Sequence, residues 1–196
     1  MNHEETYHLI GNIDIYVLDQ ILKNTYQPGQ SILDAGCGEG RNLKWFYHND
    51  FSLYGIDNKL ERINMAQENY PKMAKQFIVG ELENLPYGGN SFDHILCSAV
   101  LHFAKSGEHF HTMIKEMLRV LKDSGTLFIR VASNIGLEGK NGFVQDKQSK
   151  ETGNFYVTRK LISELLEIHP LQLIEPVKTT NVQDVRAMTT LVFQKQ

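Results

Sequence analysis

The stretch that decides the fold is Ser31-Ile-Leu-Asp-Ala-Gly-Cys-Gly-Glu-Gly-Arg-Asn-Leu43. A short apolar run ends in Asp34, and glycines follow at Gly36, Gly38 and Gly40 before a helical pattern begins. This order predicts a buried strand that turns sharply into a helix. Glycine leaves no side chain where the backbone must approach a bound nucleoside.

A second acid supports this interpretation. Asp57 ends the next apolar run, Leu53-Tyr-Gly-Ile56, at the distance expected of a carboxylate that binds ribose hydroxyls. An ionised carboxylate suits that role because its two oxygens accept hydrogen bonds side by side. The alternative is that Asp57 only caps a helix that starts at Asn58.

Composition places the chain in an ordinary class. Its 196 residues fit one domain, and 41% hydrophobic with 22% charged residues are globular values. The formal net charge of -3 provides no basic surface for nucleic acid or an anionic membrane. Two cysteines cannot form a disulfide scaffold, and neither a basic leader nor a membrane-length apolar run is present. We therefore expect a soluble, cytoplasmic protein.

Strands and helices alternate along the chain. The expected strands are 31–34, 52–56, 76–80, 92–98, 125–131, 170–178 and 185–194, and the expected helices are 12–26, 40–49, 58–69, 107–122 and 158–168. Alternation predicts an α/β fold with a Rossmann-like, doubly wound, seven-stranded and mostly parallel sheet. The last two strands have no helix between them, so an antiparallel last strand is expected. We expect one domain over 1–196, with 1–28 as an N-terminal helical cap.

Residues 133–157 do not fit a compact architecture. Four glycines fall between Ser133 and Phe155, and no hydrophobic period is sustained. A structureless segment of this length is either a lid or binding loop or disordered. Because it follows the fifth strand at its carboxyl end, where open α/β sheets bind ligands, we expect a lid loop.

Five segments in order resemble the motifs of the class I S-adenosylmethionine-dependent methyltransferases. They are Leu33-Asp-Ala-Gly-Cys-Gly-Glu-Gly40, Gly55-Ile-Asp57, Gly80-Glu-Leu-Glu-Asn-Leu-Pro-Tyr87, Phe92-Asp-His-Ile-Leu-Cys-Ser98 with Val100-Leu-His102, and Glu116-Met-Leu-Arg-Val-Leu-Lys-Asp-Ser-Gly-Thr-Leu127. The chain looks most like the small single-domain members that act on small molecules. The resemblance implies S-adenosyl-L-methionine as cofactor, S-adenosyl-L-homocysteine as product and a small-molecule methyl acceptor, with no nucleic-acid or membrane partner.

The resemblance also implies which residues contact the cofactor. They are Asp34, Gly36, Gly38, Gly40, Arg41, Asn42, Asp57, Asn58, Glu81, Leu82 and Ser98. Two alternatives stay open: Gly36 or Gly40 serves only strand–helix packing, and Arg41 with Asn42 simply begins the helix. Glu81 departs from the family, in which Asp is usual at the adenine-contacting position.

Catalysis needs little from side chains, because a sulfonium methyl donor is already activated. A general base is needed only if the acceptor loses a proton during attack. His102, after the fourth strand, is the catalytic candidate, although it equally fits a loop histidine that caps the next helix. The candidate acceptor-binding residues are Tyr16, His102, Arg130 and Asn134; packing is the alternative for Tyr16.

Other chemistries are disfavoured by motif. Cys97 follows Leu96 rather than the proline that covalent cytosine methylation requires, so it is expected to be a core thiol. The Asp/Asn-Pro-Pro-aromatic signature of base amino-group methylation is missing from the chain. His102, His109 and His111 lack zinc-site spacing, so no metal is expected.

Two rival functions remain. An NAD(P)-dependent oxidoreductase also uses glycines after its first strand, and Tyr156-Val-Thr-Arg-Lys160 matches a Tyr-x-x-x-Lys spacing. Two features argue against an oxidoreductase. Asp34 stands two residues before the first glycine, which is not typical of that family, and Thr158 looks like a helix N-cap that would separate Tyr156 from Lys160. The second rival is a non-catalytic module that binds the cofactor or its product, with the stretch from Ser133 to Phe155 as a docking segment.

Overall fold

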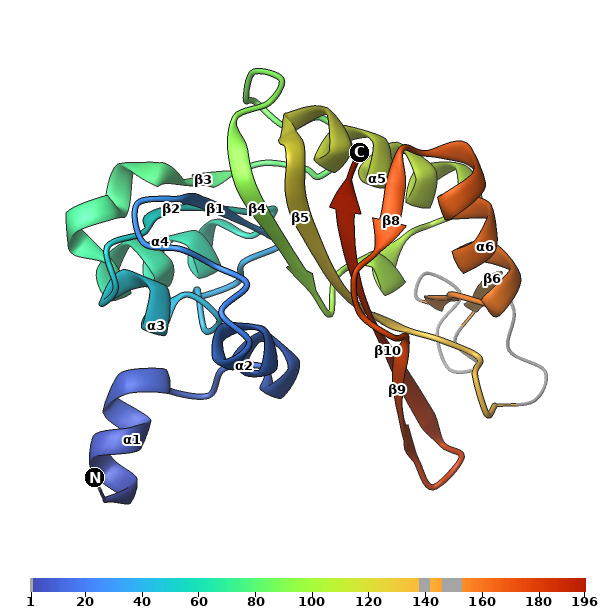
Figure 1. Ribbon diagram of the computed structural model, residues 1–196, viewed down its shortest axis with the longest axis horizontal. Coiled ribbons are helices and arrows are strands. Elements are labelled where there is room, and N and C mark those ends of the chain that lie inside the picture. Colours follow the sequence, from blue (N-terminus) through green and yellow to red (C-terminus); the bar gives the residue numbers. More distant parts are fainter. Residues whose placement is uncertain (1, 138–141, 146–152) are drawn as a thin grey trace.

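A central sheet organises the molecule. The computed structural model describes residues 2–137, 142–145 and 153–196. Its eight-stranded sheet has the order β3-β2-β1-β4-β5-β10-β8, and β9 also pairs with β10 (Figure 1). The strands are β1 (Ser31–Ala35), β2 (Ser52–Asp57), β3 (Phe77–Val79), β4 (Phe92–Ser98), β5 (Leu121–Ala132), β8 (Leu171–Leu173), β9 (Lys178–Val182) and β10 (Arg186–Lys195).

The sheet reverses its strand order beside β1. The strands β1 to β5 pair in parallel, with β2 on one side of β1 and β4 on the other. At such a reversal the loops leaving two neighbouring strands diverge, which opens a crevice at their carboxyl ends. The glycine-rich loop and the segment after β4 both start there.

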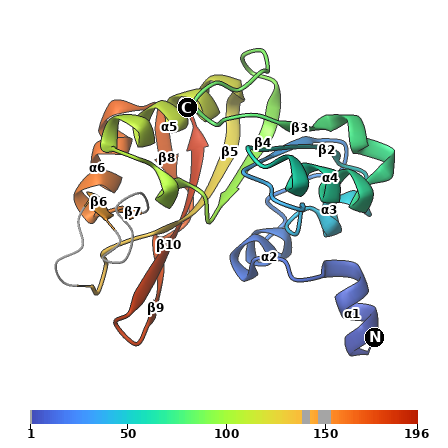
Figure 2. The ribbon, with the colours of Figure 1, turned by 180° about the vertical axis from the view of Figure 1, so that it is seen from behind.

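Helices cover both faces of this sheet. They are α1 (His3–Ile10), α2 (Ile15–Leu22), α3 (Lys44–Tyr47), α4 (Leu60–Asn69), α5 (Gly107–Val120) and α6 (Arg159–Ile168), with 3₁₀ turns η1 (Pro71–Gln76) and η2 (Leu101–Phe103). Figure 2 shows α5 and α6 beside the β5, β10 and β8 half, and α3 and α4 beside the β1 to β3 half.

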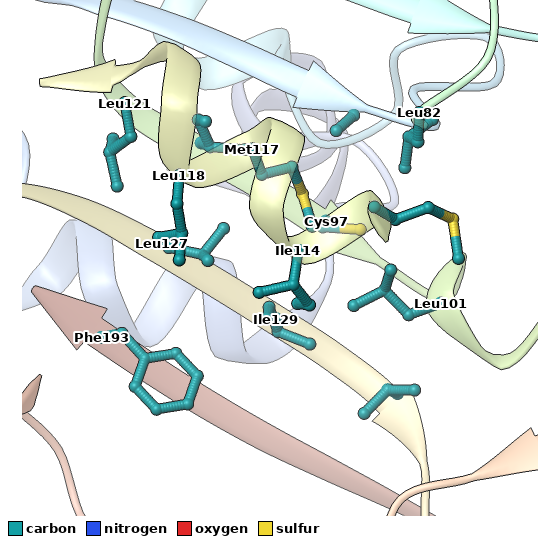
Figure 3. Packing of buried hydrophobic residues seen from close by; sticks show 14 of the residues in the cluster. Leu82, Cys97, Leu101, Ile114, Met117, Leu118, Leu121, Leu127, Ile129 and Phe193 are labelled. Carbon is teal, nitrogen blue, oxygen red and sulfur yellow. The ribbon is translucent and has the colours of Figure 1, made fainter. Parts of the chain in front are cut away.

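Alternating residues along each strand build two separate cores. On β4, Ile95 and Cys97 join the core under α5 and α6, whereas Leu96 joins the core under α2, α3 and α4. Figure 3 shows Ile114 and Met117 of α5 packed over the strands of the first core. Burial on both faces explains the nearly continuous apolar runs of the inner strands. The expectation that Cys97 is a core thiol is met, since its side chain is fully buried.

The carboxyl-terminal strands differ from the prediction. The expected antiparallel pairing is confirmed, because β10 runs antiparallel to β5, β8 and β9. The expected single strand 170–178 is wrong: residues 174–177 interrupt it, with a bend at 174–175, and β8 and β9 are separate strands. Pro176 lies between the two strands and has no N–H to donate to a ladder. The seven expected strands therefore become eight.

The amino-terminal half also differs in its helices. The expected helix 40–49 is only the four-residue α3, because residues 40–43 form turns. The expected helix 12–26 shortens to α2, whose N-cap is Asp14, and α1 was not foreseen. An Asn2–Glu5 capping box starts α1. Both helices lie within the expected cap 1–28.

The segment 133–157 is not structureless. Its described residues include β6 (Gly142–Gln145) and β7 (Gly153–Tyr156), which pair antiparallel. Phe155 of β7 is buried, and its ring stacks on Phe110 of α5 with centroids 5.0 Å apart. The rest, 138–141 and 146–152, lies outside the described residues, and a lid role stays a prediction. In the parts of the chain that the structure describes, no helix has the length and apolarity to cross a membrane.

A buried histidine ties β4 to the start of β1. His94 Nδ1 lies 2.7 Å from Thr126 Oγ1, and its Nε2 lies 2.7 Å from Gln30 Oε1. Burial lowers the pKa of His94 from 6.5 to about 4, with Lys122 adding to the shift and Asp93 opposing it. The folded protein therefore holds this ring neutral.

This neutral ring predicts a pH-dependent stability. Below the unfolded pKa the unfolded chain binds the proton and the folded chain does not, so stability is lost as pH falls from 6.5 toward 4. His94→Gln should abolish about 2 kcal/mol of the stability difference between about pH 7 and about pH 4.5. Urea unfolding at both pH values measures it. An unchanged difference in the variant would contradict the assignment.

Candidate cofactor and acceptor site

The glycine-rich loop folds back onto the end of β2. The main-chain N–H groups of Gly36 and Cys37 donate to Ile56 O at 2.8 and 3.0 Å, and Gly38 N donates to Asp57 Oδ2 at 2.9 Å. Gly36 has φ +80°, and a Cβ atom there would lie 2.3 Å from Val100 Cγ2. Only glycine fits, because both the backbone conformation and the Val100 contact exclude a side chain.

Asp57 is held by the main chain on both sides. Its Oδ2 accepts from Gly38, and its Oδ1 accepts from Lys59 N at 3.0 Å. The N-cap of α4 is Lys59, so Asp57 is not the capping residue. Each carboxylate oxygen has a second lone pair, so Asp57 keeps acceptor capacity for a ligand.

A cavity of about 600 Å³ opens at this edge of the sheet. That volume lies within the usual range for small-ligand sites. Of the predicted residues, its lining includes Gly36, Gly38, Asp57, Asn58, Glu81 and Leu82. Asn58 and Glu81 are exposed, and Asn58 Nδ2 lies 3.5 Å from Glu81 Oε2, at the outer limit of a hydrogen bond. Leu82 is buried.

Most of the remaining lining comes from residues that follow β4 or flank the predicted ones. They are Lys59, Arg62, Glu83, Ala99, Val100, Phe103, Lys105, His109 and Met113. Ala99 has φ +63°, which is unusual outside glycine, and its N–H donates to Arg130 O at 2.7 Å. The sequence signal for this wall is its place after the fourth strand, where ligands bind in open α/β sheets.

Asp34 lies beneath the loop and not in the cavity lining. Its side chain is buried, and within residues 2–137, 142–145 and 153–196 its Oδ2 has no hydrogen-bond partner. Burial raises the pKa of Asp34 to about 7, with Arg41 opposing the rise and Asp57 reinforcing it. Because Asp34 is not among the residues that line the cavity, its contact with the cofactor stays a prediction.

Gly40 and Asn42 serve packing in this structure. A Cβ atom on Gly40 would lie 2.4 Å from Tyr70 Cε2, and the Tyr70 hydroxyl donates to Gly40 O at 2.6 Å. Asn42 is buried, and its Oδ1 accepts from Asp14 N at 3.0 Å. The packing alternative for Gly40 therefore has a direct contact behind it, whereas Arg41 and Asn42 do not begin a helix, because α3 starts at Lys44.

Asp14 was not predicted from the sequence, although its side chain lies close to three predicted site residues, Arg41, Ser98 and Arg130. Its side chain is fully buried. Its Oδ2 accepts from Ser98 Oγ at 3.0 Å and from Arg130 Nη1 at 2.7 Å. Arg41 Nη2 lies 3.7 Å from the same oxygen, and Arg41 Nη1 donates to Asn12 O. The only local signal was an Asp just before an apolar helix pattern, which marks an N-cap.

Two of the four predicted acceptor residues lie together beside Asp14. The Arg130 guanidinium carbon is 5.2 Å from the centre of the Tyr16 ring. The Tyr16 hydroxyl lies 2.7 Å from Thr180 Oγ1 on β9, so the β9–β10 hairpin joins this neighbourhood. We call Asp14, Tyr16, Ser98, Arg130 and Thr180 the Asp14 cluster.

The other two predicted acceptor residues are placed separately. His102 lies in η2 with its ring 4.3 Å from that of Phe103, and its buried Nδ1 has no partner among the residues that the structure places. Burial, with Arg186 nearby, lowers the pKa of His102. Asn134 holds the following segment, since its N–H donates to Val157 O and its carbonyl accepts from Leu137 N.

Two rival chemistries can be compared with the structure. Tyr156 lies in β7 and Lys160 in α6, and Thr158 between them caps α6, with its Oγ1 accepting from Leu161 N at 3.0 Å. The expected N-cap is confirmed, and the Tyr-x-x-x-Lys spacing does not lie on one helix. As for metals, the described part of the chain holds no group of three His, Cys, Asp or Glu side chains arranged as ligands.

Comparison with known proteins identifies the family. Residues 33–129 match the family described as "Methyltransferase domain". An uncharacterized methyltransferase of Bacillus subtilis, YodH, is 32% identical over 51% of this chain and 42% of its own length. A "Probable tRNA methyltransferase 9B" of Mus musculus is 29% identical over 70% of this chain and 29% of its own length. This chain spans about half the length of the first curated relatives that it matches.

A solved structure shows the same fold. The 1,6-didemethyltoxoflavin-N1-methyltransferase of Burkholderia thailandensis, with bound 1,6-didemethyltoxoflavin and S-adenosylhomocysteine, has a TM-score of 0.73 and 14% identity, covering 98% of this chain and 82% of that one. Residues 33–129 therefore form a methyltransferase domain, and this match supports the class I S-adenosylmethionine-dependent methyltransferase family that the sequence resembles.

The residues present fit the family's cofactor. Gly38 lines the cavity, and a Cβ atom there would meet no other atom within 4 Å, so the cavity reaches the bare main chain. Asp57 would accept from the ribose hydroxyls, and Leu82 with Met113 offers apolar surface to the adenine. These assignments stay predictions.

The first prediction from this site concerns Asp57. Asp57→Ala should weaken S-adenosylhomocysteine binding at least about tenfold, because hydrogen bonds to a charged group contribute about 1.5–3 kcal/mol. Isothermal titration calorimetry measures the affinity. Asp123→Ala, which removes an exposed carboxylate paired with Lys195, is the control and should bind as wild type does. Wild-type affinity in Asp57→Ala would remove the ribose assignment.

The second prediction distinguishes backbone strain at a glycine from direct interference with the bound cofactor. Gly38 and Gly29 both have positive φ and open space around a Cβ atom, but only Gly38 lines the cavity. Replacing either with Ala should cost about 1–2 kcal/mol of stability. Only Gly38→Ala should also weaken S-adenosylhomocysteine binding, by about tenfold. Equal affinities in the two variants would show that the cofactor does not approach the loop.

Proposed function

We propose that this chain is an active methyltransferase that moves a methyl group from S-adenosyl-L-methionine to a small-molecule acceptor. The observation that carries the proposal is where three consecutive residues lie at the end of β4: Ser98, Ala99 and Val100. Ser98 binds Asp14 in the Asp14 cluster, while Ala99 and Val100 line the cavity. A donor site and an acceptor site thus meet at the carboxyl end of β4, as a direct transfer requires.

The proposed reaction depends mainly on how the cofactor and the acceptor are positioned. When bound, the cofactor supplies an electrophilic methyl group on a sulfonium. The chain's own residues orient the two reactants: the loop main chain and Asp57 on one side, and the Asp14 cluster on the other. Such alignment supplies a large part of the rate enhancement, because the sulfonium donor is already activated.

His102 fits a proton acceptor if the acceptor atom carries a proton. Its lowered pKa keeps the ring neutral at neutral pH, and its Nδ1 is buried without a partner in the described residues. A neutral imidazole is suited to general-base catalysis. We retain His102 as the catalytic candidate of this proposal.

The surroundings of the acceptor site favour a small molecule over nucleic acid. Arg130 has only 21% of its side chain exposed, because α2 and Tyr16 cover it. The formal net charge is -3, whereas nucleic-acid binding relies on an extended basic surface. The resemblance to the murine tRNA methyltransferase makes RNA the acceptor class to test against. A cytoplasmic location is part of the same proposal.

Transfer of labelled methyl groups tests this function. The full chain is incubated with methyl-labelled S-adenosylmethionine and, in parallel, with the low-molecular-weight fraction of a cell extract and with total tRNA. We expect label in a small-molecule product and an equal amount of S-adenosylhomocysteine. Label in tRNA alone would overturn the acceptor class. Cofactor binding without transfer to either pool would instead support the non-catalytic module.

A further inference from the structure

Arg130 is oriented but has hydrogen-bond donors to spare. Its Nη1 donates to Asp14 Oδ2 at 2.7 Å, and its guanidinium lies over the Tyr16 ring. Its Nε is buried, and no acceptor reaches it from any residue that the structure describes. A guanidinium carries five N–H donors in a fixed plane, and a buried donor without an acceptor costs free energy.

The charges around Arg130 do not balance. One carboxylate, that of Asp14, faces both Arg130 and Arg41, at 2.7 and 3.7 Å. The neighbourhood of Asp14 therefore holds two arginines against one carboxylate, although the whole chain is acidic.

We propose that Arg130 binds an oxyanion of the methyl acceptor, and that Asp14 is the positioning residue that aims the guanidinium. The acceptor class is then a small molecule with a carboxylate or similar planar oxyanion. Such a group accepts two parallel N–H bonds from a guanidinium, an arrangement that the ammonium of lysine cannot reproduce. This inference rests on the proposed function, whose donor site lies on the other side of Ser98.

Tyr16 and Thr180 complete the arrangement. The Tyr16 hydroxyl is bound to Thr180, so the ring is held at one end by β9 and packs on Arg130 by its face. The ring covers the guanidinium and shields it from water, which strengthens an ionic hydrogen bond. The amino-terminal cap and the β9–β10 hairpin thus both shape the oxyanion site.

Paired probes test the charge requirement. The S-adenosylhomocysteine-saturated full chain is titrated with salicylate and salicylamide, anthranilate and anthranilamide, and lactate and lactamide, and the same compounds are offered as acceptors with labelled cofactor. We expect at least one acid to bind about tenfold tighter than its amide. Arg130→Gln should abolish that preference, and Arg130→Lys should restore only part of it.

Two further variants separate positioning from structure. Asp14→Asn should raise KM for the preferred acid, or weaken its binding, by about tenfold while the affinity for S-adenosylhomocysteine stays near the wild-type value. Arg159→Gln removes an exposed arginine on α6 and should change neither quantity. Circular dichroism verifies that each variant is folded.

The contradicting outcomes are distinct. Equal binding of acids and amides by the wild-type chain, no binding of any acid, or an unchanged preference in Arg130→Gln would make the Asp14–Arg130 pair a structural ion pair only. Any of these results with intact S-adenosylhomocysteine binding leaves the proposed function standing. A chain that does not bind S-adenosylhomocysteine would instead overturn the proposed function itself.

Discussion

The site depends on the main-chain hydrogen bonds that hold the glycine-rich loop against the end of β2. Gly36 and Cys37 share the carbonyl of Ile56, and Gly38 donates to the carboxylate of Asp57. These bonds hold the loop directly against β2, and the Val100 side chain after β4 packs on Gly36, where only glycine fits. A cavity bounded by bare backbone on one side and by Asp57 on the other is the direct consequence.

A second constraint joins this cavity to the acceptor side. Asp14 is the N-cap of α2, and the same carboxylate holds Ser98 and Arg130 at the carboxyl ends of β4 and β5. Removing one partner from a buried ion pair is costly, because the other charge stays buried without compensation. The amino-terminal cap is therefore tied to the sheet where the two proposed substrates meet.

Local features of this molecule were predictable from the sequence, and long-range ones were not. Short sequence patterns predict strand β4 and the N-cap of α6 by Thr158. They also predict the order in which a strand, the glycine-rich loop, a helix and the acid Asp57 follow one another. Asp14 was missed because its partners Asn42, Ser98 and Arg130 lie 28, 84 and 116 positions away. The helix expected over 40–49 was too long, since Tyr70 and Asp14 hold its first residues in turns by tertiary contacts.

A crystal structure of the chain with S-adenosylhomocysteine tests the central claim most directly. The account predicts that the adenosyl group fills the cavity between Gly38, Leu82 and Val100, with the ribose hydroxyls bound to Asp57 and the homocysteine end directed toward the Asp14 cluster. A ligand bound at another place on the surface, or in the cavity without contact to Asp57, would contradict it.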